Sequence, residues 1–305
     1  SSDLEAVKNV FSYDTNEAES LFNKIEWMIA DITDVTSLEA AFKNIEYVYH
    51  CAAYISFNPR HYPVLKKVNI EGTANVVNFC LTEGVKKLCY ISSIATLGKT
   101  TDGSLSTEET EFNPEEDNSV YAITKHEAEM QVWRGTQEGL DAIIVHPGVI
   151  IGEGVWSSAS GGVFRTISKG LRYYTPGGVS IVDVKDVVKA MIILTTSTIK
   201  NEAYILVAKN IYYKELIAKI SVSLNKKPPN KTIAKWMMIS VVNLDWFLYK
   251  VFRIKRKLLK ATVRSLYKTS FYDASKIKKV LGFKFTPSDK MIERVARNYR
   301  KDFKF

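Results

Sequence analysis

Short apolar runs alternate with longer segments of helical periodicity along the first half of the chain. The apolar runs fall at 25–30, 47–50, 87–91 and 142–145, and the main helical patterns lie at 38–44, 64–83 and 120–137. Strands that are apolar throughout are buried on both faces, and regular alternation of strand and helix is typical of a parallel sheet. The pattern therefore predicts an α/β fold whose parallel sheet is covered by helices on both sides.

The second half of the chain is less regular. After Gly152 a Gly- and Ser-rich stretch leads to a helix at 187–194 and a further strand at 203–207. From Tyr212 onward the pattern is mostly helical, and Gly282 fits the residue that ends a helix in the left-handed conformation. We predict a smaller, mostly helical part following the sheet.

Small and polar residues follow each predicted strand of the first half. They are Asp31, Ala52, Ala53, Ser92, Ser93, Pro147 and Gly148. In an open parallel sheet, ligands bind outside the carboxyl ends of the strands. We therefore expect these residues to meet at one edge of the sheet and to form one ligand-binding crevice.

Tyr121 and Lys125 are the first candidates for chemistry. Residues four apart share one helix face, so both should lie on a stripe with Ala128 and Val132. A cation about 4 Å away, at an effective dielectric constant of about 20, is worth at most roughly 4 kcal/mol, which would bring a phenol of pKa roughly 10 close to neutrality. A general acid–base works best there. Such a pair also arises by chance on helices, so its meaning depends on the rest of the chain.

The composition excludes several classes of protein. The 305 residues are 46% hydrophobic and 25% charged, as in ordinary globular proteins. Cys51, Cys80 and Cys89 have no metal-binding spacing and are odd in number, which predicts reduced thiols and a cytoplasmic location. The four histidines form no array, so we predict no metal site. The polar residues after Ser1 lack the apolar run of a signal peptide.

The net charge of +9 is concentrated after Asn225, in Lys226–Lys227, in Arg253–Lys257 and in the last dozen residues. Because no nucleic-acid motif accompanies this charge, we favour a solvated basic face over nucleic-acid binding. An anionic ligand or a membrane surface would also suit it. The apolar run 236–252 is interrupted by polar and charged residues, which predicts a buried or interfacial helix rather than a membrane span.

Taken together, the motifs resemble those of the extended branch of the short-chain dehydrogenase/reductase superfamily. Within that branch the chain is most similar to the 3β-hydroxysteroid dehydrogenase and dihydroflavonol reductase group. The resemblance rests on Asp31-Ile32-Thr33-Asp34, His50-Cys51-Ala52-Ala53, Asn69-x-x-Gly72-Thr73, Ser92-Ser93-Ile94-Ala95-Thr96-Leu97-Gly98, Tyr121-x-x-x-Lys125, Pro147-Gly148-Val149-Ile150-Ile151-Gly152, Val182-Asp183-Val184-x-Asp186 and Tyr272-Asp273-x-Ser275-Lys276.

This resemblance implies a Rossmann-type, doubly wound parallel sheet. Residues 1–152 and 181–208 would form the dinucleotide-binding domain, and residues 153–180 and 209–305 the substrate-binding part. The family's first strand–helix–strand unit, with its G-x-x-G-x-x-G turn for the pyrophosphate, has no counterpart here, and Ser1 corresponds to a point just past the family's second strand. Either an N-terminal segment is omitted or the chain is a damaged family member, and we favour omission because every later catalytic position is intact. We expect weak or absent binding of NAD and NADP by the 305 residues alone.

The resemblance also assigns roles to residues. Tyr121 would pass a proton to or from a substrate oxygen, Lys125 would lower the phenol's pKa and bind the nicotinamide ribose, and Ser93 would hold the substrate oxygen. The cofactor contacts implied are Asp31, Ile32, Cys51, Ala52, Ala53, Asn69, Ser92, Tyr121, Lys125, Pro147, Gly148, Val149 and Ile150. As structural alternatives, Ser93 and Asp31 could simply cap turns, and we expect His146 to be structural.

The function implied is NAD(P)-dependent hydride transfer to or from a ketone or secondary alcohol of a small apolar or aromatic substrate. A nucleotide-sugar epimerase or dehydratase is the first alternative. Leu97–Gly98 stands where the sugar branch has Tyr-Gly, and Ile94–Ala95 supplies no dehydratase acid. A non-enzymatic, cofactor-sensing protein is the second alternative, and an intact Ser/Tyr/Lys set argues against it.

Three expectations concern surfaces. Large side chains of the C-terminal part could line an apolar substrate pocket, although we favour their packing together as core; they are Tyr212, Trp236, Met237, Met238, Trp246, Phe247 and Tyr249. The segment 235–257 could instead lie on a membrane surface with its basic residues toward lipid phosphates. The helices at 64–83 and 120–137 could pair in a homodimer.

Overall fold

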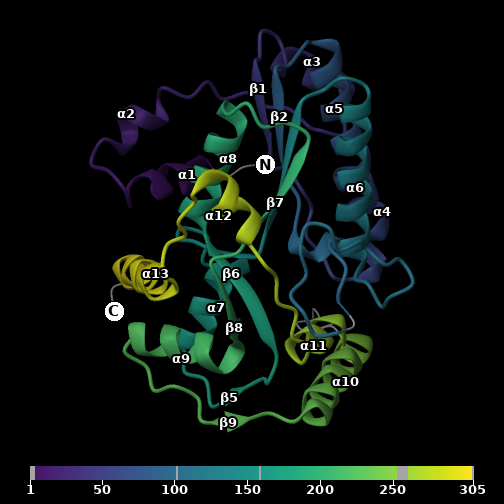
Figure 1. Cartoon of the computed structure of the whole chain (residues 1–305). Coiled ribbons are helices and arrows are strands. Elements are labelled where there is room, and N and C mark those ends of the chain that lie inside the picture. Colours follow the sequence, from purple (N-terminus) through teal and green to yellow (C-terminus); the bar gives the residue numbers. More distant parts are fainter. Residues whose placement is uncertain (1–3, 101, 158, 253–259, 304–305) are drawn as a thin grey trace.

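A four-stranded parallel sheet forms the centre of the chain (Figure 1). The computed structural model describes residues 4–100, 102–157, 159–252 and 260–303. The strands are β1 (Tyr47–His50), β2 (Lys87–Ile91), β3 (Ala142–Pro147) and β7 (Glu202–Leu206), in the order β1-β2-β3-β7. All three pairings are parallel. The predicted α/β fold is thus confirmed.

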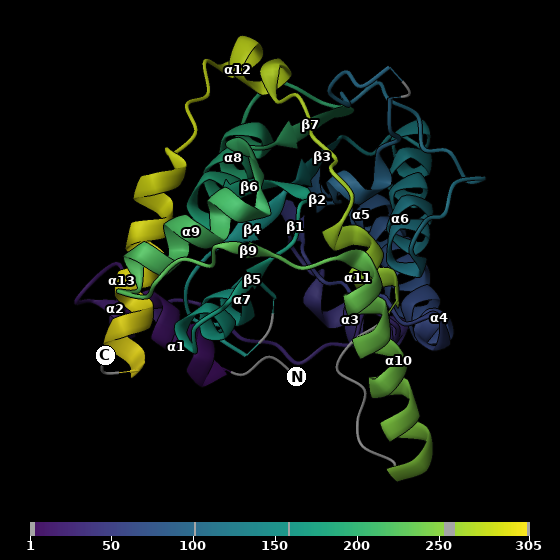
Figure 2. The same cartoon turned by 90° about the horizontal axis from the view of Figure 1, so that it is seen from below.

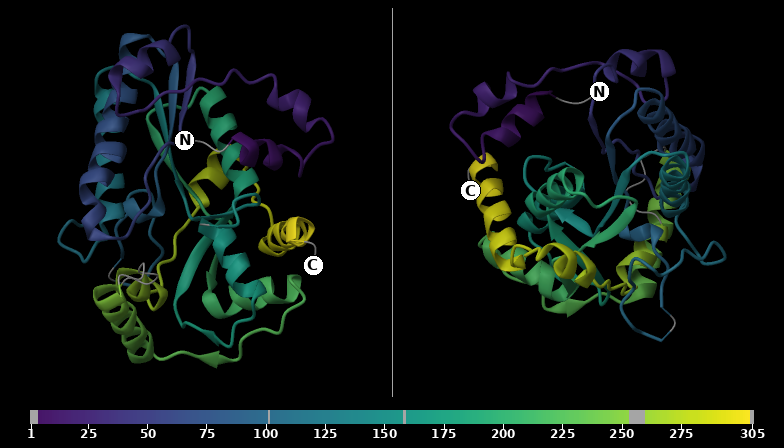
Figure 3. Two further views of the ribbon diagram at one scale, coloured as in Figure 1. Left: turned by 180° about the vertical axis from the view of Figure 1, so that it is seen from behind. Right: turned by 45° about the horizontal axis from the view of Figure 1, so that its top comes forward.

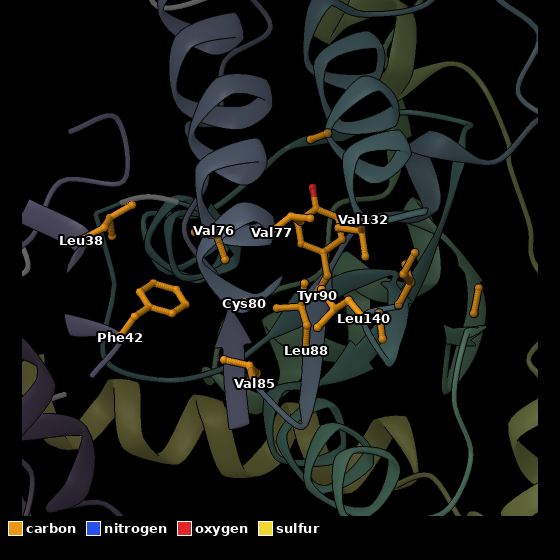
Figure 4. Packing of buried hydrophobic residues seen from close by; sticks show 14 residues of the cluster. Leu38, Phe42, Val76, Val77, Cys80, Val85, Leu88, Tyr90, Val132 and Leu140 are labelled. Atoms are coloured by element: carbon orange, nitrogen blue, oxygen red, sulfur yellow. The ribbon is translucent and has the colours of Figure 1, made fainter. Parts of the chain in front are cut away.

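Helices cover both faces of this sheet. On one face lie α4 (Tyr62–Leu65), the π-helix η2 (Lys66–Glu71), α5 (Gly72–Thr82) and α6 (Val120–Gln137). On the other lie α8 (Val184–Thr196) and α12 (Ser275–Leu281). Figure 4 shows the first interface, where Val76 and Cys80 of α5 and Val132 of α6 pack with Leu88 and Tyr90 of β2. Burial on both faces explains why the strands are apolar throughout.

The N-terminal region contains α1 (Leu4–Phe11), α2 (Ala18–Phe22) and α3 (Val35–Ala41). Figure 3 shows α1 and α2 beside the end of α13 (Ser288–Phe303), away from the sheet, and the Tyr13 hydroxyl donates to Asp302 there. Asp34 caps α3 through a hydrogen bond from the backbone of Thr36.

The strand predicted at 25–30 is wrong. The segment is irregular, and Trp27, Met28 and Ile29 are 42%, 51% and 104% exposed. A strand needs a neighbour for its backbone N–H and C=O groups, and within the described residues β1 pairs only with β2, on one side. The segment 25–30 does not add to the free edge of β1, so its apolar pattern was not sufficient to predict a strand.

A second, smaller sheet follows in the order β4-β6-β8. It contains β4 (Val149–Ile151), β6 (Gly178–Asp183) and β8 (Lys209–Tyr212), and helices α7 (Ala159–Ser168), α9 (Tyr213–Ser223) and α13 pack in its core. The remaining short elements are η1 (Pro59–His61), η3 (Ile94–Thr96), β5 (Tyr173–Tyr174) and β9 (Lys231–Thr232). Within the part of the chain that the structure describes, no helix combines the length and apolarity needed to cross a membrane.

Ion pairs and hydrogen bonds join the C-terminal helices to the second sheet and to α8. Arg294 of α13 donates to both Asp183, at 2.6 and 2.8 Å, and Glu153, at 3.1 Å. Asp186 of α8 accepts from the backbone and hydroxyl of Thr286. Gly282 ends α12 at a φ of 61°, the left-handed cap predicted from sequence.

Helix α10 (Lys235–Phe252) and helix α11 (Lys260–Leu266) form a separate pair, and Figure 2 shows α10 projecting from the body of the molecule. The expectation that the large C-terminal side chains pack together as core is wrong. Tyr212, Trp236, Trp246 and Phe247 are 53%, 70%, 46% and 51% exposed. The basic run Arg253–Lys257 falls in 253–259, outside the described residues.

Candidate active site

Strand β2 places two serines at the carboxyl edge of the sheet. Ser93 begins the 3₁₀ turn η3, and its Oγ accepts a hydrogen bond of 3.1 Å from the backbone N–H of Ala95. The turn-capping interpretation of Ser93 is therefore confirmed. A hydroxyl that accepts from the backbone still has its own proton to donate, so capping leaves Ser93 able to bind a further oxygen.

Helix α6 brings a phenol to the same place. Ser119 caps the helix by accepting from the backbone of Ala122. The stripe predicted to face the protein does so, with Lys125, Ala128 and Val132 buried and Tyr121 half-buried. The Tyr121 hydroxyl lies close enough to the side chain of Ser93 for the two to interact, and this interaction lowers the pKa of Tyr121. A hydroxyl and a phenol from distant parts of the chain thus converge, as the motifs predicted.

Lys125 lies one helical turn beyond Tyr121 and is 2% exposed. Its Nζ donates to the Tyr90 hydroxyl at 2.6 Å and to the backbone carbonyl of Ile91 at 2.7 Å, both on β2. The ammonium also lies 4.1 Å from the centre of the Tyr90 ring. Burial lowers the pKa of Lys125 to about 7, although the Glu129 carboxylate opposes the shift.

The predicted effect of Lys125 on the Tyr121 pKa is not found. Burial raises the pKa of Tyr121 above its ordinary value, and the interaction with Ser93 opposes this only in part. The physical reason is that the Lys125 amine is hydrogen-bonded to Tyr90 and Ile91 of β2 and not to Tyr121. A phenol with a raised pKa is protonated at neutral pH, but it is a weaker acid than a free tyrosine.

A chain of buried polar groups continues behind Lys125. The Tyr90 hydroxyl, which accepts from Lys125, also interacts with the side chain of Thr73 of α5, and this interaction opposes the rise in the Tyr90 pKa that burial causes. The Thr73 hydroxyl in turn lies 2.9 Å from Nε2 of His50, at the end of β1. Burial lowers the pKa of His50 to about 3, so its imidazole is neutral at physiological pH. The amine is thus held by a network that spans β2, α5 and β1.

Glu129, one turn beyond Lys125, is a second buried charged group. Its Oε2 accepts from the hydroxyls of Ser92 at 2.5 Å and Thr96 at 2.9 Å, and lies 2.9 Å from Nε2 of His146. Burial raises the pKa of Glu129, but the His146 imidazole and the two hydroxyls outweigh burial and hold the pKa down to about 2. Glu129 therefore ties α6 to β2, η3 and β3, and His146 is structural as expected.

The Asn69-x-x-Gly72-Thr73 motif holds neighbouring segments together. The Asn69 amide bonds both backbone groups of Tyr54, at 2.7 and 3.1 Å, and the hydroxyl of Thr124 at 3.2 Å. A Cβ on Gly72 would come within 2.7 Å of Ile32, so glycine lets the turn after residue 30 approach α5. The cofactor contact predicted for Asn69 stays a prediction, and its bonds to Tyr54 favour an indirect role.

Asp31 lies at the surface and caps its own turn. Its Oδ1 accepts from the backbone and the hydroxyl of Thr33, at 2.8 and 2.9 Å, and the backbone bond is the main reason why the pKa of Asp31 is lowered. The turn-capping interpretation is thus confirmed.

The other predicted cofactor contacts lie at the ends of β1 and β3. Cys51, Ala52 and Ala53 are exposed where β1 ends, and Val149 is 42% exposed after β3. Pro147 and Gly148 are buried, Ile150 is half-buried, and a Cβ on Gly148 would come within 2.6 Å of the Ser180 carbonyl. The carboxyl edge of the sheet therefore presents small and apolar groups beside Ser93 and Tyr121.

Two hollows lie away from this edge. One of about 580 Å³ lies between α9 and α13, beside Lys219 and Asp289, and one of about 240 Å³ lies between α7 and α9, beside Ile217. Neither is lined by the catalytic candidates. Within the described residues, no group of three His, Cys, Asp or Glu side chains is arranged to hold a metal.

Sequence reasoning missed Glu129, Tyr90 and Thr124. Tyr90 lies within an apolar run and reads as core, and Thr124 reads as an ordinary helix residue. The one available signal was spacing, because Glu129 lies four residues after Lys125 and so extends the Tyr121–Lys125 face.

Comparison with known proteins gives the following matches. Residues 5–206 match the model of the NAD dependent epimerase/dehydratase family. A Synechocystis protein provisionally named dihydroflavonol 4-reductase is 24% identical over 85% of this chain and 77% of that protein. Sterol demethylase protein B of Methylococcus capsulatus is 29% identical over 61% of this chain and 57% of that protein.

Solved structures agree on the fold. The crystal structure of gox2253 superposes with a TM-score of 0.78 and 26% identity, covering 97% of this chain and 94% of that one. UDP-glucose 4-epimerase of Thermotoga maritima has a TM-score of 0.75 at 19% identity, covering 98% of this chain and 96% of that one. The predicted Rossmann-type class is therefore confirmed.

Proposed function

Because the chain belongs to the NAD-dependent epimerase/dehydratase family, we propose that it reduces a ketone, or oxidises the corresponding secondary alcohol, on a small apolar or aromatic substrate. The observation that supports this proposal most directly is the convergence of Ser93 and Tyr121 at the carboxyl edge of the sheet. A protonated phenol suits the reduction direction at neutral pH, because the developing alkoxide needs a proton.

The chain's own residues account for the acid–base half of the reaction. Ser93 accepts from the backbone of Ala95 and so directs its own proton outward, toward the substrate oxygen or Tyr121. Tyr121 then donates its proton to that oxygen as the carbonyl is reduced. Lys125 lies one turn away with a pKa of about 7, and at neutral pH it can both release and accept a proton.

The residues at the edge fit the nicotinamide half of the cofactor. Exposed Ala52 and Ala53 present no side chain beyond Cβ, and the Lys125 amine offers a donor for ribose hydroxyls. The cofactor supplies the hydride. The sequence contains no G-x-x-G-x-x-G turn for the pyrophosphate, so we expect these 305 residues to bind NAD(H) and NADP(H) weakly.

Sugar-nucleotide chemistry is the alternative that a specific match favours. UDP-glucose 4-epimerase of Vibrio cholerae is 30% identical over 54% of this chain. Leu97–Gly98 stands where the sugar branch has Tyr-Gly, and Ile94 and Ala95, beside Ser93, supply no acid for a dehydratase. These residues support the ketone reductase over the sugar-modifying enzymes.

An assay at millimolar NADH or NADPH tests the proposal directly. Oxidation of the cofactor is followed with a panel of aromatic and alicyclic ketones. Conversion of UDP-glucose to its 4-epimer in the presence of NAD⁺ is measured separately, because epimerisation consumes no NADH. We expect turnover with at least one ketone and none with the sugar nucleotide. Tyr47→Phe is a matched control, because this exposed tyrosine lies at the amino end of β1, away from the catalytic edge. Epimerisation of UDP-glucose without ketone reduction would contradict the proposal.

A further inference from the structure

Helix α10 is apolar on nearly every side, although only one side is packed. Its inward stripe is formed by Met238, Val242, Asp245 and Tyr249, spaced four, three and four residues apart, with Val242 fully buried. Between Trp236 and Val251 its polar or charged residues are Ser240, Asn243, Asp245 and Lys250. A helix that is apolar all round is normally buried on all sides, so the outer side of α10 lacks the cover that its composition requires.

The outward stripe lies opposite the packed one. Trp236 is 70% exposed, Leu244 57%, Phe247 51% and Val251 53%. These positions follow the helical period, so their side chains point to one side. Single exposed apolar residues are ordinary, but a continuous stripe of large ones marks an interaction surface. Figure 2 shows that the body of the protein leaves this helix projecting, which makes its outer side accessible along its length.

The charge around α10 identifies the partner. Residues 226–268 contain twelve of the 42 Lys and Arg residues and one of the 33 Asp and Glu residues. The rest of the chain therefore carries a formal charge of −2, and the whole positive excess belongs to this segment. Lys231, Lys235 and Lys250, at and beside the two ends of the helix, are all exposed.

We propose that α10 lies flat on the surface of an anionic lipid bilayer. The outward stripe enters the region between headgroups and acyl chains, and the lysines contact lipid phosphates. Val242 stays packed on the protein side, so the helix lies in the membrane plane. A second copy of the chain is the less suitable occupant, because two segments of the same strong positive charge would repel one another when placed face to face.

Cosedimentation with vesicles tests this surface. The full chain is mixed with vesicles of phosphatidylcholine alone or of phosphatidylcholine with phosphatidylserine. We expect binding to the anionic vesicles, weaker binding to the neutral ones, and a fall in binding as salt is added, because exposed charges are screened. A blue shift of tryptophan fluorescence on binding, lost in Trp236→Ser, would place α10 in the lipid.

Three sets of variants separate the contributions of the apolar stripe and of the lysines to vesicle binding. Trp236→Ser with Phe247→Ser should lower the partition coefficient at least about tenfold, because two large apolar side chains no longer leave water. Replacing Lys231, Lys235 and Lys250 by Gln should lower binding to anionic vesicles roughly a hundredfold, at about one factor of five per lysine, and should change binding to neutral vesicles little. Ile192→Ser with Val222→Ser, which removes equally exposed apolar groups from α8 and α9, should leave binding unchanged.

Two results would overturn the proposal. The first is a failure of the folded chain to bind anionic vesicles at low salt. The second is a sedimentation experiment in which the chain forms a dimer that Trp236→Ser and Phe247→Ser dissociate, because the stripe would then cover a second copy. Neither result depends on enzymatic activity, so this inference and the proposed function can fail separately.

Discussion

The region beneath the catalytic residues and the outer side of α10 depart from ordinary burial in opposite directions. In the first, the charged groups Lys125 and Glu129 are 2% and 7% exposed, although such residues are almost never buried. In the second, Trp236 and Phe247 are 70% and 51% exposed. The first region removes charge from water, and the second leaves large apolar groups in water.

The two regions differ in whether other residues of the chain compensate for the unusual burial or exposure. Around Lys125 and Glu129, hydrogen bonds to Tyr90, Ser92 and His146 replace the lost water. Around α10 the described residues provide no such replacement for the outward stripe. Where other residues of the chain compensate for the unusual burial, the buried groups have a role inside the protein. Under the proposed function, that role is to position the catalytic groups. Where no residue of the chain covers exposed apolar side chains, the exposure indicates an external partner.

The largest expected effect is a loss of turnover when the hydroxyl of Tyr121 is removed. Tyr121→Phe removes the proton donor while keeping the ring against Phe57. We expect turnover to fall about 10²- to 10⁴-fold, the usual contribution of a general acid, with the fold retained by circular dichroism. Activity equal to that of the wild type would remove Tyr121 from the mechanism.

The next effect is a loss of stability when the buried carboxylate of Glu129 is removed. Glu129→Ala leaves the buried partners Ser92, Thr96 and His146 without their shared acceptor, and we expect a loss of about 3 kcal/mol in the free energy of unfolding. Denaturant titration measures it. Glu127→Ala, on the same helix but half-exposed, is the control and should cost less than about 0.5 kcal/mol.

The lowered pKa of Glu129 also predicts that the protein loses stability at acid pH. Its pKa is depressed from 4.5 to about 2 in the folded protein, so the unfolded chain takes up the proton first. The stabilisation is complete above pH 4.5 and is lost as the pH falls toward 2. Denaturant titrations across this range should show a shallower fall in Glu129→Gln than in the wild type. Parallel curves would mean that Glu129 does not titrate in this way.

A third effect on stability concerns the buried amine. The pKa of Lys125 falls from 10.5 to about 7 on folding, so between these values the unfolded chain binds a proton that the folded chain does not. Stability should rise with pH across this window by about 1.4 kcal/mol per pH unit relative to Lys125→Met. A pH-independent difference between the two proteins would show that the amine is charged in both states.

The smallest expected effect is on stability, when the outward stripe of α10 is mutated. Phe247→Ser should change the free energy of unfolding by less than about 0.5 kcal/mol, because the side chain is already half in water. Val242→Ser, on the packed side of the same helix, should cost several times more. Similar losses for both, measured by thermal unfolding, would mean that the outward stripe is covered within the protein.

The sequence predicted the parts of the site that rest on spacing. Tyr121 and Lys125 share a helix face because four residues make about one turn, and Ser93 meets Tyr121 because strand ends share a sheet edge. Glu129 could not be predicted, because a glutamate on a helix usually faces water and only tertiary packing places His146 against it. The segment 25–30 has the pattern of a buried strand, but a strand also requires a neighbour, which periodicity cannot reveal. The same limit applies to α10, whose apolar sequence indicates burial without naming the partner.

Transfer of deuterium from cofactor to substrate is the most direct test of the central claim, that Ser93, Tyr121 and Lys125 serve hydride transfer to a carbonyl. The protein is incubated with NADH deuterated at the reactive position and with a ketone that it turns over, and the alcohol product is examined by mass spectrometry. The account predicts an alcohol carrying one deuterium, formed far more slowly by Tyr121→Phe. An alcohol without deuterium, or equal formation by the variant, would contradict it.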